Sequence, residues 1–470
     1  MPTLPKTSIL SLPPWSQSLL LALASAALAG AMLAGGSSQQ AMISTAVDDL
    51  LSLPLLGFAL WLGIRHGLGK ALWPAAILAA GLAIGAAQLI SLPVDVWRTL
   101  PGRGAALADI LAAGPAPRFL AASLDRGGTA RALASLTPAI AIFLGVAMLA
   151  REGRRRLIWL ILCLGVLGAL VGIAQATGVM SSFYTVTNPG FAVGFFANRN
   201  HFAALMYVLL PMAAAMAAAD RSAGGEGHGQ WRRAAVLAAA GMGAVYLLAL
   251  AACGSRAGLA LGVVALIGSW AILAPRGGGA DQAAGWAPGL VILAAIAVFA
   301  LLQFTRVGLL AGGKSLPLDE GRAAITATTL HAAARYAPLG TGLGAFVPVY
   351  EAAEPVSTLT GDYINHAHDD WAELWLEGGV AMAAVTGAFL TWFAIAARRA
   401  WGSAMGRIGG SFARAGAIVV GLLMVHSTVD YPLRTGAMSA LFALACALMV
   451  PPHLDSRYRG PPLTTGENPN

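Results

Sequence analysis

The chain has 470 residues, of which 57% are hydrophobic and 11% are charged, and its mean hydropathy is +0.72. These values lie far from those of globular domains and exclude a soluble enzyme or binding module as the overall class. The formal net charge is +8, but no basic stripe alternates with aromatic residues outside the apolar runs, so no nucleic-acid partner is expected.

Apolar runs long enough, or nearly long enough, to cross ~30 Å of hydrocarbon recur along the whole chain. They predict an all-α, polytopic membrane helical bundle of about 12 transmembrane helices, and residues 1–470 are expected to form one integral membrane domain. The runs cover residues 15–35, 46–64, 71–92, 132–150, 156–177, 201–219, 234–252, 257–274, 287–304, 378–397, 415–430 and 436–450.

The distribution of basic residues predicts the orientation. More than half of the 29 lysines and arginines fall in segments that are cytoplasmic if the N-terminus is inside, among them Arg154, Arg155 and Arg156. Basic residues favour the cytoplasmic side of a membrane protein. We therefore expect both termini in the cytoplasm, with 452–470 as a disordered tail, and the two long segments 93–131 and 305–377 on the outer face.

The first outer segment, 93–131, mixes acids with basic residues and predicts short interfacial helices. A solvated connector is the favoured interpretation, and contacts of its arginines with anionic lipid or glycan are the alternative. These arginines are Arg98, Arg103, Arg118 and Arg126.

The second outer segment, 305–377, predicts a large loop on the outer face, which the family resemblance described below makes periplasmic, with a helix of its own before the tenth span. The helical pattern runs from Asp319 to Arg335, and Pro338 and the following glycines end it. The glycines lack the strand-before, helix-after context and the Lys-Ser/Thr pair of a phosphate-binding loop. A structural turn is the favoured interpretation.

The polar cluster at the end of this loop is the strongest functional signal. Five acids and two histidines lie between Asp362 and Glu377 in a chain with few charges. His368 can accept a proton near neutral pH, and a nearby carboxylate can orient it. His366, Asp369 and Asp370 are candidates for support. A metal site is a less specific alternative, since His-x-His with flanking acids is not a specific zinc pattern, and a solvated helix start is the plain one.

Two arginines offer forked donors at the same face. Arg256 precedes a predicted span, where it can bind a phosphate oxygen or extend to the lipid headgroups. Arg322 lies in the outer helix, where a surface ion pair with Asp319 is the alternative.

Further polar residues flank two spans. Asn198, Arg199 and Asn200 stand before the sixth apolar run, where they can hold sugar hydroxyls or cap the helix. His426 and Asp430 are one helical turn apart, and we expect them to pair with Arg434.

The order of these motifs resembles that of the O-antigen ligase and polymerase superfamily. The resemblance spans roughly residues 190–435, and the order and spacing are more specific than any single motif. It rests on Phe196-x-Asn198-x-Asn200-x-Phe202, Ser255-Arg256-Ala257-Gly258, Arg322, Pro338-x-Gly340-x-Gly342-x-Gly344-x-Phe346, His366-Ala367-His368-Asp369-Asp370 through Gly379, and His426 to Asp430.

The resemblance implies an inner-membrane, metal-independent, inverting glycosyltransferase of the C-type membrane architecture, without a cofactor. The donor would be a glycan on undecaprenyl diphosphate, bound at the periplasmic face by Arg256 and Arg322. His368 would activate the acceptor hydroxyl. The partners would be this donor, a glycan or lipid A-core acceptor, membrane lipid and, as a further candidate, a chain-length regulator.

The acceptor is the open question. Where the ligase pattern has His-Asn, this chain has His368-Asp369, which favours a polymerase of O-antigen or exopolysaccharide repeats over a ligase acting on lipid A core. A transporter is the alternative from another class. Transport usually places ionisable groups near the bilayer midplane, whereas the polar residues here gather at the outer face.

Overall fold

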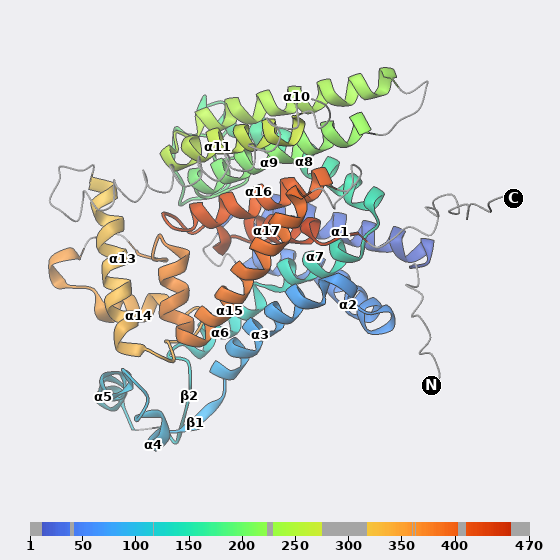
Figure 1. Ribbon diagram of the computed structural model, residues 1–470. Helices are drawn as coiled ribbons and strands as arrows, with labels where there is room; N and C mark the ends of the chain where they lie inside the picture. Colours follow the sequence, from blue (N-terminus) through green and yellow to red (C-terminus); the bar gives the residue numbers. More distant parts are fainter. Residues whose placement is uncertain are drawn as a thin grey trace, which may run out of the picture.

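The computed structural model describes residues 12–37, 42–115, 117–222, 229–274, 317–359, 361, 363–402 and 410–452. These parts form a largely helical bundle (Figure 1). In them, nine helical segments are long and apolar enough to cross a membrane, and two shorter apolar helices accompany them. The chain is thus a polytopic helical membrane protein. The predicted run 287–304 and the tail 453–470 lie outside the described residues.

The long helices follow the predicted apolar runs. They are α1 (Pro14–Ala34), α2 (Met42–His66), α3 (Leu72–Gln88), α6 (Arg126–Ala134) continued by α7 (Thr137–Met148), α8 (Arg151–Ala176), α9 (Arg199–Ser222), α10 (Gly229–Ala252), α11 (Arg256–Leu273), α15 (Asp370–Trp401), α16 (Gly410–His426) and α17 (Gly436–Met449).

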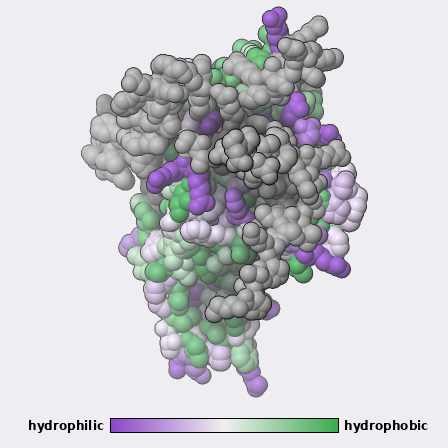
Figure 2. All heavy atoms as spheres, turned by 45° about the vertical axis from the view of Figure 1, so that its right-hand side comes forward, coloured by the Kyte–Doolittle hydropathy of each residue, from purple (hydrophilic) through white to green (hydrophobic). Residues whose placement is uncertain are grey.

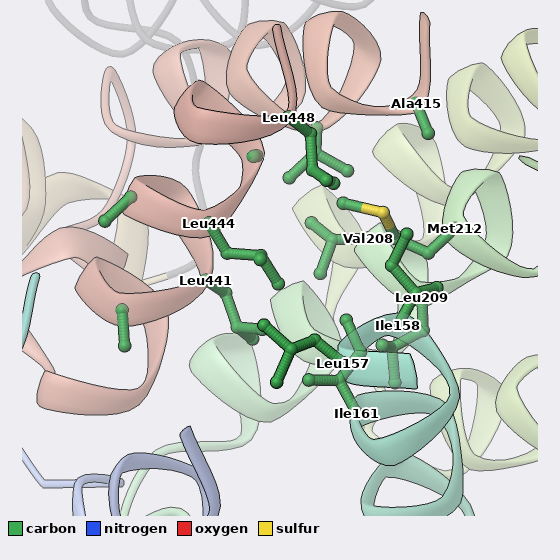
Figure 3. Packing of buried hydrophobic residues seen from close by; sticks show 14 of the residues in the cluster. Leu157, Ile158, Ile161, Val208, Leu209, Met212, Ala415, Leu441, Leu444 and Leu448 are labelled. Carbon is green, nitrogen blue, oxygen red and sulfur yellow. The ribbon is translucent and has the colours of Figure 1, made fainter. Parts of the chain in front are cut away.

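Helix α9 lies at the centre of one half of the bundle. It is apolar around its whole circumference, and a helix of that kind is stable only when other helices cover it. Helices α8, α10, α11 and α16 pack around it. Figure 3 shows Leu157 and Ile161 of α8 meeting Leu209 of α9, with Leu441 of α17 on the other side. This packing fixes the start of α9, where Asn200 and His201 lie.

The surface of the bundle suits a bilayer. Figure 2 shows broad hydrophobic areas on the described surface, with hydrophilic side chains at its lower end and along the sides. Exposed leucine, valine and tryptophan side chains are frequent on α2, α3, α10 and α11. Hydrocarbon, and not water, is the solvent that such a surface requires.

Two hydrogen bonds show which helix ends lie together. The side chain of Gln17 near the start of α1 donates to the carbonyl of Met148, and Arg154 of α8 donates to the carbonyl of Val450 after α17. The start of α1, the α7–α8 connection and the end of α17 therefore share one end of the bundle. The α16–α17 connection, residues 427–435, lies at the opposite end.

The first outer segment forms a small unit at this opposite end. Strands β1 (Ser91–Pro93) and β2 (Phe119–Ala121) pair antiparallel around α4 (Val94–Trp97) and α5 (Arg103–Ala113). The short helices agree with the prediction, and the two-stranded sheet is an addition to the expected all-α fold. Arg103 is buried and donates to the carbonyls of Ala122 and Gly340, so it fixes this unit to the second outer segment and is available neither to solvent nor to lipid or glycan.

The second outer segment contains α13 (Pro317–Tyr336), α14 (Phe346–Ala353) and an extended loop that leads to α15. A separate small hydrophobic core joins these elements and contains Ile325, Phe346, Tyr350 and Leu376. Helix α15 begins at Asp370, earlier than the predicted run at 378, because Asp369 caps it by accepting the backbone N–H groups of Trp371 and Ala372.

Gly379 interrupts α15 with φ +56° and ψ −153°, so that a short outer helix precedes the apolar part. The glycines at 340, 342 and 344 also have positive φ, which confirms the predicted turn.

Candidate active site

Asp430 is the centre of a buried polar group at the end of the bundle that holds the α16–α17 connection. One carboxylate oxygen, Oδ2, accepts a hydrogen bond from Nδ2 of Asn200 at 2.7 Å and lies 3.7 Å from Nη2 of Arg322. The other oxygen, Oδ1, lies 3.3 Å from Nδ1 of His368 and 3.8 Å from Nε2 of His201. Residues from α9, α13, the loop before α15 and the α16–α17 connection thus meet at one carboxylate.

These neighbours keep Asp430 ionised. Burial alone would raise the pKa of its carboxyl group, but the Arg322 guanidinium and the nearby His201 and His368 imidazoles hold the pKa well below its usual value. A buried charge without partners would be strongly destabilising. The donors around Asp430 therefore give a fixed negative charge beside the His368 imidazole.

His368 has an unusual backbone conformation. Its φ is +53°, and it is the sole non-glycine residue with positive φ in the described part of the chain. Such a conformation is costly and persists only where surrounding contacts impose it, commonly at functional sites. Here Thr326 of α13 donates to the carbonyl of Ala367 on one side, and the Asp369 cap fixes the other side. The conformation turns the imidazole toward Asp430.

The charge state of His368 follows from its surroundings. Burial lowers the pKa of the imidazole, and Asp430 offsets this effect only in part. His368 is therefore neutral at pH 7. With Nδ1–H directed at Asp430, Nε2 is the basic nitrogen, in the tautomer that a general base requires.

Tyr431 holds three imidazole rings in place. Its ring centroid lies 4.9 Å from that of His201, 4.6 Å from that of His366 and 4.8 Å from that of His368. The hydroxyl group of Tyr431 reaches the side-chain oxygen of Asn365 at 3.5 Å. The two histidines of the His-x-His motif thus face one aromatic side chain from the α16–α17 connection, and His366 does not contact Asp430.

A second ionic group stabilises the framework behind the first. Arg434 bridges three acids of α15: Asp370 at 3.4 Å, Glu373 at 3.4 Å and Glu377 at 3.2 Å. Burial alone would lower the pKa of the Arg434 guanidinium, but Glu373, Glu377 and Asp370 raise it. We call these four residues the Arg434 cage.

The cage also fixes the backbone of two loops. Glu373 accepts from Nδ1 of His366 and from the N–H of Ala367, both at 2.9 Å, and Glu377 accepts from the N–H of Gly344 at 2.8 Å. The acids that appeared as a charged patch in the sequence are therefore mainly structural.

The two remaining arginines lie at neighbouring helix starts. Gly258 of α11 packs so closely on α9 that a Cβ atom there would lie 2.6 Å from Cβ of Ala203, which places Arg256 near the level of Asn200. The guanidinium of Arg199 lies over the ring of Phe191 at 4.0 Å and beside the Gly254 turn. Helix N-termini carry partial positive charge, so these two starts together favour an anion.

The structure brings together four of the residues that the sequence singled out: Asn200, Arg322, His368 and Asp430. His366 and Asp370 belong to the cage and its loop, whereas Asn198 and Asp369 cap helices, Asn198 by accepting from the N–H of Asn200. Arg199 and Arg256 lie at the starts of α9 and α11.

The expected pairing of Asp430 and His426 with Arg434 is wrong. Helix α16 ends at His426, so the i, i+4 spacing of Asp430 and Arg434 does not place them on one helical face. Arg434 turns toward α15, and His426 bonds through Nδ1 to the Tyr207 hydroxyl at 2.9 Å. The contributions of Tyr431 and the Arg434 cage were not predicted, although each stands within a few residues of a selected position.

Residues 233–381 match the family model described as O-Antigen ligase. This part of the chain is similar to the O-antigen ligase family, in agreement with the predicted resemblance to the ligase and polymerase superfamily. The match contains Arg256, Arg322 and His368, whereas Asn200 and Asp430 lie outside it and are joined to the matched part only by the fold. No curated protein matches the chain. The similarity supports a glycosyltransferase-like function of the ligase or polymerase type in a multi-pass membrane protein.

Proposed function

We propose that this protein transfers a glycan from an undecaprenyl diphosphate carrier to an acceptor sugar on the periplasmic face of the bacterial inner membrane. The observation that carries the proposal is the His368–Asp430–Arg322 group, in which a fixed carboxylate lies between a neutral imidazole and a guanidinium. The superfamily match favours glycan transfer over the transport of a solute.

The chemistry needs a base and a place for the leaving group. Nε2 of His368 removes the proton of the acceptor hydroxyl as its oxygen attacks the anomeric carbon of the donor sugar. Asp430 stabilises the imidazolium that forms. The bond from the anomeric carbon to the diphosphate oxygen breaks as the new bond forms on the opposite face of the sugar, so the reaction inverts the anomeric configuration.

Arginines would meet the charge of the donor. A diphosphate gains negative charge as it leaves, and guanidinium groups offer forked donors to its oxygens. We assign this role to Arg322 and Arg256, with the starts of α9 and α11 contributing their partial positive charge. Because these cations supply the stabilisation, transfer by the purified protein is expected to continue in EDTA, and its loss there would contradict metal independence.

The arrangement of the bundle supports the proposed sidedness. The basic start of α8, with Arg151 and Arg154, lies at the end shared with the start of α1 and the end of α17, and basic residues favour the cytoplasmic side. The Asp430 group lies at the other end. We further propose twelve spans and a C-type glycosyltransferase architecture, in which the run 287–304 adds to the described helices.

We propose that the acceptor is a second repeat unit, so that the enzyme is a polymerase of O-antigen or exopolysaccharide. Ligation to lipid A core uses the same chemistry and is the alternative. The cap role of Asp369 weakens the sequence argument for polymerisation, because asparagine and aspartate cap helices equally well.

Complementation of a deletion strain tests the proposal. His368→Ala is expected to abolish glycan assembly, and His331→Ala, which changes an exposed histidine on α13, serves as the matched control. Full assembly by the His368→Ala variant would contradict the mechanism. On a gel, surface glycans of the deletion strain with single repeats on core indicate a missing polymerase, whereas long carrier-bound chains indicate a missing ligase.

A further inference from the structure

A large cavity lies beside the candidate active site but does not include its base. Its volume is about 1470 Å³, and it runs between α3, α6 and α7 on one side and α15 and α17 on the other. Asn365 and His366 line its outer end, whereas His368, Arg256 and Arg322 do not line it. The wall between the cavity and the Asp430 group is the loop before α15.

Most of the cavity wall is apolar and belongs to spanning helices. The cavity is lined by Leu78 of α3, Phe143 of α7, Phe389 and Trp392 of α15 and Phe442 of α17. At this level of a membrane protein, the molecules available to fill an apolar cavity are lipid chains.

The polar end of the cavity carries two carboxyl groups with unmet hydrogen-bonding capacity. Asp48 is 3% exposed, and Oδ1 of Asp48 and Oδ1 of Asp49 have no hydrogen-bond partner in the described part of the chain. Oδ2 of Asp48 is held against the start of α17, where a Cβ atom at Gly436 would lie 2.5 Å from it. Buried carboxylate oxygens nearly always have a partner, so these two oxygens point to a donor that a ligand brings.

The charges around this end of the cavity indicate which kind of hydrogen-bond donor the ligand carries. Four other acids line the cavity, but Asp370, Glu373 and Glu377 are already matched by Arg434 in the cage. The fourth, Asp125, lies 3.7 Å from Arg131, whose side chain is 56% exposed. The carboxylates of Asp48 and Asp49 therefore favour a cationic donor, while Arg131 provides a positive charge at the same end.

We propose that this cavity binds a membrane lipid whose head carries a protonated amine next to a phosphate, as in phosphatidylethanolamine. The ammonium group supplies three N–H donors to the Asp48 and Asp49 carboxylates. The phosphate is placed at the end of the cavity where Arg131 lies, and the acyl chains follow the apolar wall. A lipid with a phosphate but no amine leaves the two carboxylates unmatched and adds a like charge. This site is separate from glycan transfer and does not depend on the proposed activity.

Lipid retention by the purified full-length protein tests the proposal. The protein is reconstituted with equal amounts of phosphatidylethanolamine and phosphatidylglycerol that carry the same acyl chains, and retained lipids are counted by native mass spectrometry. We expect the amine lipid to be retained over the glycerol lipid by about tenfold, the scale of one charge-assisted hydrogen bond. Equal retention, or preference for the glycerol lipid, overturns the proposal.

Variants locate the bound lipid. The double change Asp48→Asn and Asp49→Asn is expected to reduce amine-lipid retention to that of the glycerol lipid, whereas Asp95→Asn, at an exposed outer acid, leaves it unchanged. Unchanged retention by the double variant contradicts the assignment.

A second pair of variants covers the case in which the double variant fails to fold. Gly81→Leu places a side chain into the cavity, where a Cβ atom would meet no atom closer than 3.7 Å, and it should lower retention of both lipids. Gly241→Leu, on the exposed face of α10 with no atom within 4 Å, is the matched control. Equal retention by both variants overturns the location. Displacement of the amine lipid by an alkyl glucoside at matched concentration would instead identify the cavity as a sugar-amphiphile site and would also contradict the proposal.

Discussion

His368 and Asp430 are 62 residues apart in the chain, yet Nδ1 of the imidazole lies 3.3 Å from Oδ1 of the carboxylate. The contact joins the loop before α15 to the α16–α17 connection, and the positive φ of His368 turns the ring toward Asp430. Because Asp430 is held ionised by other donors, it acts on His368 as a fixed charge. The first two predictions follow from this pair.

The first prediction is the pH dependence of transfer. Only neutral His368 can accept the acceptor proton, and burial lowers the pKa of this imidazole from its usual value of about 6.5. The rate is therefore constant at neutral and mildly alkaline pH and falls as pH drops through a midpoint below about 6.5. Initial transfer rates of the purified protein across roughly pH 4.5–8, the range in which most proteins are stable, measure this midpoint. A midpoint above the usual histidine value would contradict the buried, neutral base.

The second prediction concerns Asp430→Asn. The amide removes the charge that stabilises the imidazolium, so the rate should fall by about 10²–10⁴-fold, the usual contribution of general acid–base catalysis. Asp430 raises the pKa of His368, and its loss should therefore shift the acid midpoint of any remaining activity to lower pH. Asp95→Asn, at an exposed ion pair, is the control and should change neither the rate nor the midpoint. A slower variant with an unshifted midpoint would indicate a purely structural role.

The sequence predicted the spans well because hydrocarbon demands long apolar runs, and each run within the described residues became a helix. Local signals were also sufficient for the Gly340 turn and for the caps. The grouping of Asn200, Arg322, His368 and Asp430 depends on how four distant elements pack, and only the resemblance to the superfamily suggested it.

The predicted pairing of Asp430 and His426 with Arg434 was wrong for a clear physical reason. Spacing arguments hold only while a helix continues, and α16 stops at His426 before the chain turns through Pro432. The acids of α15 showed no partner in the sequence, since their counter-ion is 57 residues from Glu377 along the chain. Conversely, Asp369 was overvalued because a capping residue and a site residue look the same in sequence.

The third prediction concerns the Arg434 cage. Arg434→Met leaves Glu373 and Glu377, which are 1% and 0% exposed, without their cation. Removing one partner of a buried ionic group costs about 3–5 kcal/mol. We expect a clear fall in the thermal unfolding midpoint of the detergent-solubilised protein. Arg98→Met, which breaks an exposed pair with Asp95, should cost only ~0–1 kcal/mol. Similar midpoints for the two variants would show that the cage contributes little.

The fourth prediction concerns the turn that supports the cage. Gly340 has φ +79°, and a Cβ atom there would lie 2.6 Å from the carbonyl oxygen of Glu377. Gly340→Ala therefore adds a backbone clash to the left-handed strain of about 1–2 kcal/mol. The variant should unfold at lower temperature and lose transfer in proportion, whereas Gly361→Ala, with no atom within 4 Å, should do neither. Wild-type stability of Gly340→Ala would mean that the turn can move away from α15.

The last prediction separates the two arginines. Arg256 lies at the first residue of α11 and is proposed to bind the diphosphate, so Arg256→Lys removes a forked donor to that group. We expect its KM for the carrier-linked donor to rise by about 10–100-fold, the scale of one to two charge-assisted hydrogen bonds, with kcat affected less. Arg322 also lies 3.7 Å from Asp430 and helps to keep that carboxylate ionised, so Arg322→Lys should reduce kcat as well as donor affinity. Steady-state kinetics with a carrier-linked donor, varied at saturating acceptor, distinguish the two patterns. If both variants change KM alone, Arg322 binds the donor without supporting the base. If both change kcat alone, neither arginine holds the diphosphate in the ground state.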